Sequence, residues 1–341
     1  MSRFDPKHPS LLDIRGSVVV VTGGGSGIGA ALVKQLYKQN CIVVFGDIDE
    51  KASKAIVSET SSRSVHFIRC DTYSYTDNLD LFNFAWENYG RVDHAIANAG
   101  VVEQEGWFIP SRTIEDINKA EPPPLTTLNV NLIGLAYFAN IACTYLSQGN
   151  QLLGGKHSRD KSLTLVGSLA SWKETPPLFM YQTAKHGVLG LLRALRLYVP
   201  EYFSGVRVNA VCPGMTETQM VALIREEYLN HGLPPNQPED VAKAIVGLCQ
   251  AGPGTNAIWY DEMEAPGVKS WKSAGGMDWE DMKRRGIVGR AIFVQGGQCY
   301  DTEEGLDRTE ALWLGGHASA IVQEAQKSRI TSTPILRTLS K

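Results

Sequence analysis

The stretch Val18–Gly29, VVVVTGGGSGIG in one-letter code, joins an apolar β-branched run to a glycine-rich turn and the start of a helix. Consecutive valines predict a buried strand, and the helical spacing of Ile28, Leu32 and Leu36 predicts the helix. Glycines let the turn adopt positive φ angles and bring backbone N–H groups close to a pyrophosphate, which the positive end of the helix dipole also attracts. The stretch therefore predicts a dinucleotide-binding unit.

Short β-branched runs alternate with amphipathic, helix-length segments along most of the remaining chain. This alternation predicts an α/β fold, a Rossmann-like doubly wound parallel sheet of about seven strands with helices on both faces. Pro238–Asp240 indicates a capped start for a helix over Val241–Cys249. The expected strands are Val18–Val21, Cys41–Gly46, Val65–Cys70, His94–Ala97, Leu163–Val166, Val206–Val211 and Ala291–Val294.

We expect the 341 residues to form a single Rossmann-like domain over 1–341. Three segments, 102–126, 147–161 and 253–286, interrupt the alternation as insertions, and 298–341 follows the last expected strand as a C-terminal extension. The insertion at 253–286 carries Trp259, Trp271 and Trp279 among mixed charges. Such a loop is expected to cover either a ligand or a partner subunit.

Composition excludes several classes of function. A net charge of −3 and a pI near 6.2 provide no global basic field, so we expect no nucleic-acid partner. No run reaches the roughly eighteen apolar residues of a membrane span, and the start MSRFDPKHPSLLDIRG lacks a signal-peptide pattern, which favours a cytoplasmic protein. The six cysteines show no Cys-x-x-Cys spacing, so neither a metal site nor a disulfide is expected.

Asp47 ends the second expected strand, at the place where a carboxylate can accept hydrogen bonds from an adenosine ribose. The same charge would repel a 2′-phosphate by on the order of 1–4 kcal/mol at close range. Asp47 therefore favours NAD over NADP. The alternative is that Asp47 caps the next turn, although Asp49 and Glu50 could also serve there.

The stretch Phe179–Gly187, FMYQTAKHG, places Tyr181 and Lys185 four positions apart, on one face of a helix. That spacing alone does not separate a solvated pair from a proton relay. Ser168 lies thirteen positions before Tyr181 and follows an expected strand, although a serine there could be only a turn hydroxyl. The three side chains become informative together with the other motifs.

Taken in order, these motifs resemble the short-chain dehydrogenase/reductase family from about Ser17 to Val221, and again over 238–252 and 289–297. Thr22–Gly29 resembles its TGxxxGIG loop, and Asn98-Ala99-Gly100 its NAG turn, with Ala97 where the family usually has asparagine. The resemblance implies bound NAD, a homodimer or homotetramer, and a set of cofactor-binding residues. They are Gly23, Ser26, Gly27, Ile28, Gly29, Asp47, Asp71, Asn98, Gly100, Tyr181, Lys185, Pro213, Gly214 and Thr218.

The resemblance also implies catalytic roles for Ser168, Tyr181, Lys185 and Asn131. Lys185 would hold the nicotinamide ribose, and Asn131 would position a water that carries protons away from Lys185. Asn129 is the alternative register for this asparagine, and a buried amide that bonds only to the backbone is the alternative role.

The chemistry of hydride transfer fits these residue types. A base must accept the hydroxyl proton of the alcohol, and a free phenol with a pKa near 10 is too rarely ionised at neutral pH. An ammonium near 4 Å would favour the phenolate by about 4 kcal/mol, on the order of three pKa units before desolvation. We therefore expect Lys185 to lower the pKa of Tyr181, and Ser168 to hold the substrate oxygen.

The expected function is an NAD(H)-dependent oxidoreductase that interconverts a secondary alcohol and a ketone. Apolar residues near Tyr181 and after Gly214 favour a lipophilic substrate, such as a steroid-like, prostanoid, terpenoid or polyketide skeleton. The alternative is an NAD-binding protein with a regulatory or a non-redox role, such as isomerisation or cyclisation. The apolar residues are Trp172, Leu178, Phe179, Met180, Met215, Met220, Val221, Leu223 and Ile224.

Overall fold

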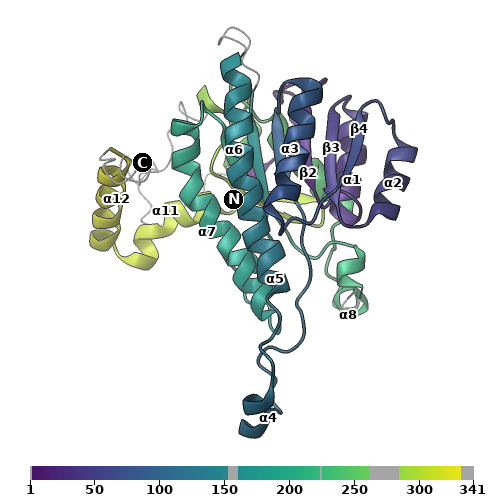
Figure 1. The fold of residues 1–341 in the computed structure, drawn as a ribbon. Coiled ribbons are helices and arrows are strands. Elements are labelled where there is room, and N and C mark those ends of the chain that lie inside the picture. The colour runs from purple at the N-terminus through teal and green to yellow at the C-terminus, as the bar shows by residue number, and fades with distance from the viewer. Residues whose placement is uncertain (1, 153–159, 223–224, 261–283, 332–341) are drawn as a thin grey trace, which may run out of the picture.

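The computed structural model describes residues 2–152, 160–222, 225–260 and 284–331 (Figure 1). Ten strands form one sheet in the order β4-β3-β2-β5-β6-β7-β9-β10-β1-β8. The strands are β1 Ser2–Phe4, β2 Val18–Thr22, β3 Ile42–Asp47, β4 Val65–Arg69, β5 His94–Ala97, β6 Ser162–Val166, β7 Arg207–Pro213, β8 Ile258–Tyr260, β9 Ala291–Gln295 and β10 Gln298–Asp301.

The seven strands expected from the sequence are β2 to β7 and β9, and these seven pair with one another in parallel. Strand β2 lies between β3 and β5, so the chain winds outward in one direction from β2 to β4 and in the other from β5 to β9. This reversal is the topological switch point of a doubly wound sheet. Ligands of such folds bind outside the carboxyl ends of the strands at that point. The fold class predicted from the sequence is confirmed.

Three antiparallel strands, which the sequence pattern did not predict, extend the sheet beyond β9. Strands β9 and β10 form a hairpin in which Gln295 pairs with Gln298 around Gly296 and Gly297, both at positive φ (55° and 73°). Positive φ at both loop positions is the requirement of a tight two-residue hairpin, which glycine meets without strain. Strand β1 then lies between β10 and β8.

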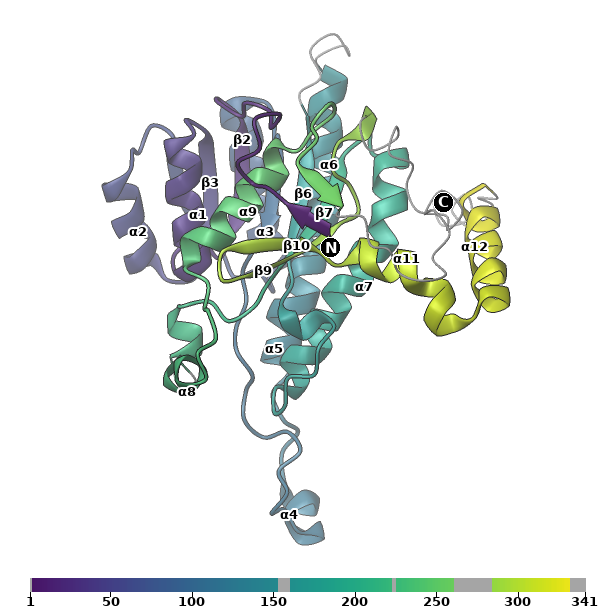
Figure 2. The same cartoon turned by 180° about the vertical axis from the view of Figure 1, so that it is seen from behind.

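Helices cover both faces of the sheet (Figures 1 and 2). The helices are α1 Gly27–Lys38, α2 Glu50–Glu59, α3 Tyr75–Tyr89, α4 Ile114–Lys119, α5 Thr126–Leu128, α6 Leu135–Leu152, α7 Phe179–Tyr202, α8 Arg225–Asn230, α9 Pro238–Gln250, α11 Glu303–Leu314 and α12 Gly316–Thr331. A π-helix over Asn129–Gly134 leads into α6, and 3₁₀ turns cover Leu169–Ser171 and Gln219–Val221.

Alternate residues of β2 divide the core into two layers. Val19 and Val21 belong to the cluster that contains Leu32 of α1 and Ile245 of α9. Val18 and Val20 belong to the other cluster, together with side chains of α3, α6 and α7. A strand buried on both faces reads as a continuous apolar run, so four consecutive valines suit this central position.

The three expected insertions differ in character. Segment 102–126 contains α4 and extends away from the sheet beyond the start of α7 (Figures 1 and 2). Segment 147–161 begins within the last turns of α6, which ends at Leu152. In segment 253–286, Trp271 and Trp279 lie outside the described residues, so its covering role stays a prediction.

The C-terminal extension begins as part of the sheet. Its residues Gln298–Asp301 form β10, after which α11 lies across α7. Glu303 at the start of α11 is buried and forms ion pairs with Arg193 (2.9 Å) and Arg196 (2.9 Å) of α7. The extension is thereby fastened to the helix that also carries Tyr181 and Lys185.

Among the described residues, the stretch Thr126–Gln148 is long and apolar enough to cross a membrane, with a mean hydropathy of 1.3. In the fold, 56% of the most apolar 18-residue window of this stretch is buried, and Phe138 and Leu146 lie in the core. A central helix of a water-soluble α/β fold has the same length and composition.

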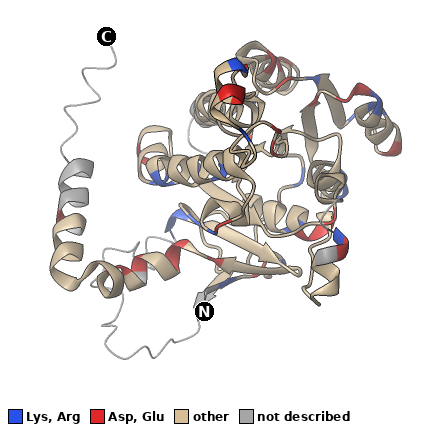
Figure 3. Ribbon diagram, turned by 90° about the horizontal axis from the view of Figure 1, so that it is seen from below, with Lys and Arg blue, Asp and Glu red and all other residues tan. Residues whose placement is uncertain are grey.

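Seen from below, acidic and basic residues are interspersed over the described ribbon (Figure 3).

Candidate active site

The glycine turn after β2 has the geometry of a phosphate-binding loop. Gly23 and Gly27 have positive φ angles (68° and 48°). A Cβ at Gly23 would lie 2.6 Å from Cα of Ala99, and one at Gly29 would lie 1.8 Å from the carbonyl oxygen of Gly23. Only glycine fits these positions. Ser26, the N-cap of α1, makes no side-chain cap, and the first turn of α1 carries no acidic residue, so this helix start suits an anion.

The turn after β5 fastens this loop from the side. Asn98 donates from Nδ2 to the carbonyl of Gly23 (2.9 Å), while the amides of Asn98 and Ala99 donate to Oγ1 of Thr22 (3.2 and 3.3 Å). The NAG turn therefore fixes the conformation of the phosphate loop through Thr22 and Gly23.

Asp47 lies where a ribose-binding acid is expected, at the end of β3 and against the loop. Its Oδ2 accepts from the amide of Gly25 (2.8 Å) and its Oδ1 accepts from the amide of Asp49 (2.9 Å). Asp49, and not Asp47, caps α2 by accepting from Ala52. The alternative that Asp47 caps the next turn is thus partly correct, because its Oδ1 bonds to the amide of Asp49 in that turn.

Polar groups crowd around Asp47 at the edge of the loop. A Cβ at Gly25 would lie 2.8 Å from both the Asp47 carboxylate and Oγ of Ser53. Ser53 is fully buried, and among the described residues its hydroxyl has no hydrogen-bond partner. A carboxylate with remaining lone pairs next to an orphaned hydroxyl suits the ribose hydroxyls of a dinucleotide.

Ser168, Tyr181 and Lys185 meet at the carboxyl ends of β6 and β7, and we call them the serine–tyrosine–lysine cluster. Ser168 follows β6 and begins the 3₁₀ turn, where its Oγ accepts from the amide of Ala170 (3.2 Å). Lys185 is buried, donates to the carbonyl of Val166 (2.9 Å), and lies 5.6 Å from the ring centroid of Tyr181. The three residues are brought together as their spacing predicts.

The pKa values differ from the expectation for Tyr181. Burial raises the pKa of Tyr181, while a hydrogen bond with Ser168 lowers it by a smaller amount. Burial also lowers the pKa of Lys185 to about 8. The expected lowering of the Tyr181 pKa by Lys185 is therefore wrong for the chain by itself, because desolvation dominates and the ammonium bonds to the carbonyl of Val166.

Asn131 lies in the π-helix and is fully buried. Its Oδ1 accepts from the amide of Val101 (2.8 Å) and its Nδ2 donates to the carbonyl of Val101 (2.9 Å). Its carboxamide thus bonds to the backbone, as the alternative role of a buried structural amide predicts. A Cβ at Gly100 would lie 3.1 Å from Oδ1 of Asn131 and 3.8 Å from Nζ of Lys185, so Asn131 does border the cluster. Its role in a proton path stays a prediction.

The other expected cofactor residues lie at the same edge of the sheet. Pro213 ends β7, and the amide of Gly214 donates to Val294 (2.9 Å). A Cβ at Gly27 would lie 3.1 Å from Cγ2 of Thr218, so the segment after β7 closes against the phosphate loop. Asp71 follows β4 and accepts from the amide of Tyr73 (3.0 Å).

Two residues near the cluster were missed by the sequence interpretation. Glu103 accepts from the amides of Met180 (3.1 Å) and Tyr181 (2.6 Å) at the start of α7. The thiol of Cys212 on β7 contacts Ser171 and has a pKa raised by burial to about 12, so it stays neutral. Neither residue belongs to a local motif, since both reach the cluster through tertiary packing.

The expected apolar pocket is only partly assembled. Phe179 packs against Phe108 of segment 102–126, which extends away from the sheet, with ring centroids 4.7 Å apart. Trp172 instead packs edge-to-face on Phe293 (5.4 Å) at the margin of the core, and Met220 is exposed. Leu223 and Ile224 lie outside the described residues.

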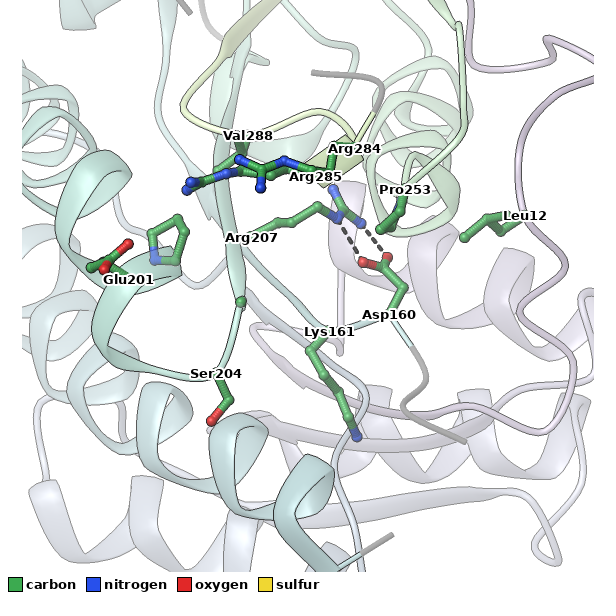
Figure 4. A pocket seen from close by; sticks show the side chains of 12 residues that line it. Leu12, Asp160, Lys161, Glu201, Ser204, Arg207, Pro253, Arg284, Arg285 and Val288 are labelled. Atoms are coloured by element: carbon green, nitrogen blue, oxygen red, sulfur yellow. Dashed lines mark hydrogen bonds and ion pairs between the residues drawn. The ribbon is translucent and has the colours of Figure 1, made fainter. Parts of the chain in front are cut away.

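A separate cavity of about 560 Å³ lies at the opposite, amino-terminal edge of the sheet (Figure 4). Lys161 and Arg207 line it, and Arg207 forms a two-pronged ion pair with Asp160 (2.8 and 2.5 Å). Lys161 likewise pairs with Asp93 (2.7 Å). This cavity therefore lies apart from the phosphate loop and the cluster.

Several named proteins are similar to this chain in sequence. A short-chain dehydrogenase/reductase, ascJ of Acremonium egyptiacum, is 33% identical over 70% of this chain and 75% of its own. The human 15-hydroxyprostaglandin dehydrogenase [NAD(+)] is 27% identical over 63% of this chain and 74% of its own. An NADP-dependent dehydrogenase, clz5 of Cochliobolus lunatus, is 30% identical over 59% of this chain and 71% of its own.

The fold has solved counterparts as well. The crystal structure of 3-ketoacyl-(acyl-carrier-protein) reductase from Brucella melitensis complexed with NADH matches with a TM-score of 0.61, covering 83% of this chain and 98% of that one. At 20% identity this likeness concerns the fold alone. The family model described as short chain dehydrogenase matches residues 17–229, more than half of the chain. With the glycine loop, the NAG turn and the serine–tyrosine–lysine cluster in their places, the chain belongs to the short-chain dehydrogenase/reductase family of oxidoreductases.

Proposed function

We propose that this protein is an NAD(H)-dependent oxidoreductase that interconverts a secondary alcohol and a ketone, with Tyr181 as the general acid and base. The observation that carries the proposal is the serine–tyrosine–lysine cluster. It lies at the same sheet edge as a phosphate loop whose neighbouring acid, Asp47, bonds to the amide of Gly25. Such an arrangement supplies both a proton acceptor and a cofactor site.

The donor set fits a dinucleotide. The start of α1 and its glycines would hold the pyrophosphate, and the carboxylate of Asp47 would hold the adenosine ribose. The relatives include both NAD-dependent and NADP-dependent proteins, so the choice rests on Asp47. Its carboxylate supports NAD, because a 2′-phosphate beside it would be repelled.

In the oxidising direction, NAD held at the phosphate loop would supply the acceptor for the hydride that leaves the alcohol carbon. Tyr181 accepts the hydroxyl proton at the same time, and Ser168 holds the oxygen that becomes the carbonyl. Since burial raises the pKa of Tyr181 in the chain by itself, the phenol is protonated at neutral pH. It is thus ready as an acid for ketone reduction. Oxidation needs the added positive charge of the nicotinamide to favour the phenolate.

We further propose a lipophilic substrate. Phe179 and Met180 precede Tyr181 on α7, and Phe108 of the extended segment lies against Phe179. The likeness to a hydroxyprostaglandin dehydrogenase supports a prostanoid, steroid-like, terpenoid or polyketide skeleton over a sugar. For assembly we propose a homodimer or homotetramer, which the exposed side chains of Tyr137 on α6 and Leu197 on α7 support. For location we propose the cytoplasm. Sedimentation velocity would test the subunit number.

The deciding experiment compares Tyr181→Phe with Tyr198→Phe, which removes a phenol from the same helix where Tyr198 stacks on Tyr202. Both proteins are assayed for NADH formation with a panel of lipophilic secondary alcohols. The first change should lower the rate by about 10²- to 10⁴-fold without weakening NAD binding, and the second should leave the rate near the parent value. Unchanged turnover in Tyr181→Phe would overturn the mechanism. Consumption of substrate without NADH formation would favour a non-redox reaction.

A further inference from the structure

Helix α7 begins without a cap of its own. Its N-cap residue, Leu178, has no side-chain acceptor, yet the first amides of a helix need partners outside the helix. The amide of Phe179 bonds to the carbonyl of Pro177 (3.1 Å). The next two amides, of Met180 and Tyr181, both donate to the carboxylate of Glu103, at 3.1 and 2.6 Å. A residue 78 positions away thus caps the helix at the tyrosine itself.

The loop that carries Glu103 is itself held on both sides. Asn131 bonds to the amide and the carbonyl of Val101, two positions earlier. Oγ1 of Thr127 donates to the carbonyl of Val102 (3.1 Å). Farther along, Phe108 packs on Phe179 of the first turn of α7. The carboxylate therefore extends from an anchored segment and does not move freely on a surface loop.

We propose that Glu103 is a positioning residue for the reaction, which fixes the first turn of α7 so that the phenol of Tyr181 meets the hydroxyl of Ser168. It touches two backbone amides and none of the reacting groups. Anionic acceptors at a helix N-terminus make strong, charge-assisted hydrogen bonds, and two oxygens on adjacent amides define an orientation as well as a position. The proposal rests on the proposed role of Tyr181 as acid and base.

This role makes a separable kinetic prediction. Lys185 lies one turn farther along α7 and is held by the carbonyl of Val166, while the phosphate loop is held by Asn98. Loss of Glu103 should therefore misplace Tyr181 and leave the cofactor site intact. Misplacement of a reacting group by about 1 Å can cost on the order of 100-fold in rate.

The test measures kcat and the KM values for NAD and alcohol in Glu103→Ala and Glu103→Gln. In Glu103→Ala, kcat should fall about 10- to 100-fold while KM for NAD stays within about two-fold. Glutamine keeps one acceptor oxygen, so Glu103→Gln should recover part of the loss. Asp240→Asn is the matched control, since Asp240 accepts from the amide of Gln237 (3.0 Å) at the start of α9. It should reduce thermal stability with little change in kcat.

A double-mutant cycle with Tyr181→Phe separates this inference from the proposed function. If Glu103 acts through Tyr181, Glu103→Ala should cost almost nothing further once the phenol oxygen is gone. An equal loss in both backgrounds, a loss confined to KM for NAD, or a kcat within about two-fold of the parent would overturn the role of Glu103 alone. Full activity in Tyr181→Phe itself would instead overturn the proposed function.

Discussion

The two edges of the parallel sheet use charge in opposite ways. At the amino-terminal edge, Lys161 pairs with Asp93 at 2.7 Å, and Arg207 pairs with Asp160. At the carboxyl edge, Lys185 bonds to a backbone carbonyl and Asp47 to two backbone amides. Among the described residues, neither Lys185 nor Asp47 forms an ion pair with a side chain of opposite charge.

The pKa values follow this difference. Burial alone would raise the pKa of Asp93, but Lys161 and the amide of Val18 keep it below its usual value. Burial lowers the pKa of Lys185 to about 8. Charges at the first edge are thus paired within the chain, whereas Lys185 and Asp47 at the second have no ion-pair partner among the described residues, which fits the cofactor site proposed there. The cavity beside Arg207 in Figure 4 belongs to the neutralised edge.

Replacing each buried lysine by methionine tests the comparison most strongly. Lys185→Met should lower the oxidation rate by about 10²- to 10⁴-fold, because both the charge near Tyr181 and a cofactor contact are lost. Its free energy of unfolding at neutral pH should not fall, since a desolvated ammonium is removed. Steady-state kinetics and urea unfolding measure the two effects. A loss of stability without loss of rate would reverse the roles assigned to the two edges.

Lys161→Met should show the opposite pattern. Asp93 would remain fully buried with Arg91 (3.0 Å) as its remaining ion-pair partner, so the free energy of unfolding should fall by about 3 kcal/mol. The kcat of the folded enzyme should change little. Adding Asp93→Asn to this variant removes the buried carboxylate that has lost Lys161 and should recover part of the stability. If the double variant is no more stable than the single one, the cost has another origin.

Local signals explain which features the sequence predicted. The strand, turn and helix of Val18–Gly29 are neighbours in the chain, and each constrains the next. Ser168, Tyr181 and Lys185 lie on consecutive elements, so their spacing carried the geometry of the cluster. Gly296-Gly297 is a two-residue turn signal, from which the hairpin of β9 and β10 could have been predicted. Strands β1 and β8, of three residues each, are too short for a periodic pattern.

Features that depend on tertiary packing could not be predicted in the same way. Glu103 lies in a segment that looks like a surface insertion, and only the folded chain brings it to Tyr181. For the chain by itself, the pKa of Tyr181 was predicted in the wrong direction, because desolvation depends on how the folded chain buries the phenol. The spacing of residues in the sequence predicts which side chains come together. Their burial, and therefore their pKa values, can be predicted only from the folded structure.

Asp47 at the carboxyl edge tests the proposed preference for NAD. Asp47→Ala removes the carboxylate that opposes a 2′-phosphate, so the preference for NAD over NADP should narrow by about 1–3 kcal/mol, roughly 5- to 150-fold in the ratio of kcat/KM. Asp49→Ala is the matched control, because Asp49 caps α2 through Ala52 without contacting the loop glycine. It should lower stability slightly and keep the preference. An unchanged ratio in Asp47→Ala would remove the basis for assigning NAD.

The smallest effect concerns the pH dependence of stability. Lys185 has a pKa of about 8 in the folded chain, against an ordinary value of 10.5 for an exposed lysine, so the unfolded chain binds more protons between these two values. Stability therefore rises with pH through that window, by about 1 kcal/mol from pH 8 to pH 9 for this group. Buried thiols such as Cys212, with a pKa raised to about 12, act in the opposite sense above their usual value of 9.0. The difference in unfolding free energy between the parent and Lys185→Met cancels the thiols and isolates the lysine. A flat difference across this range would mean that the ammonium of Lys185 finds a charged partner in solution, and the contrast between the two edges would then be lost.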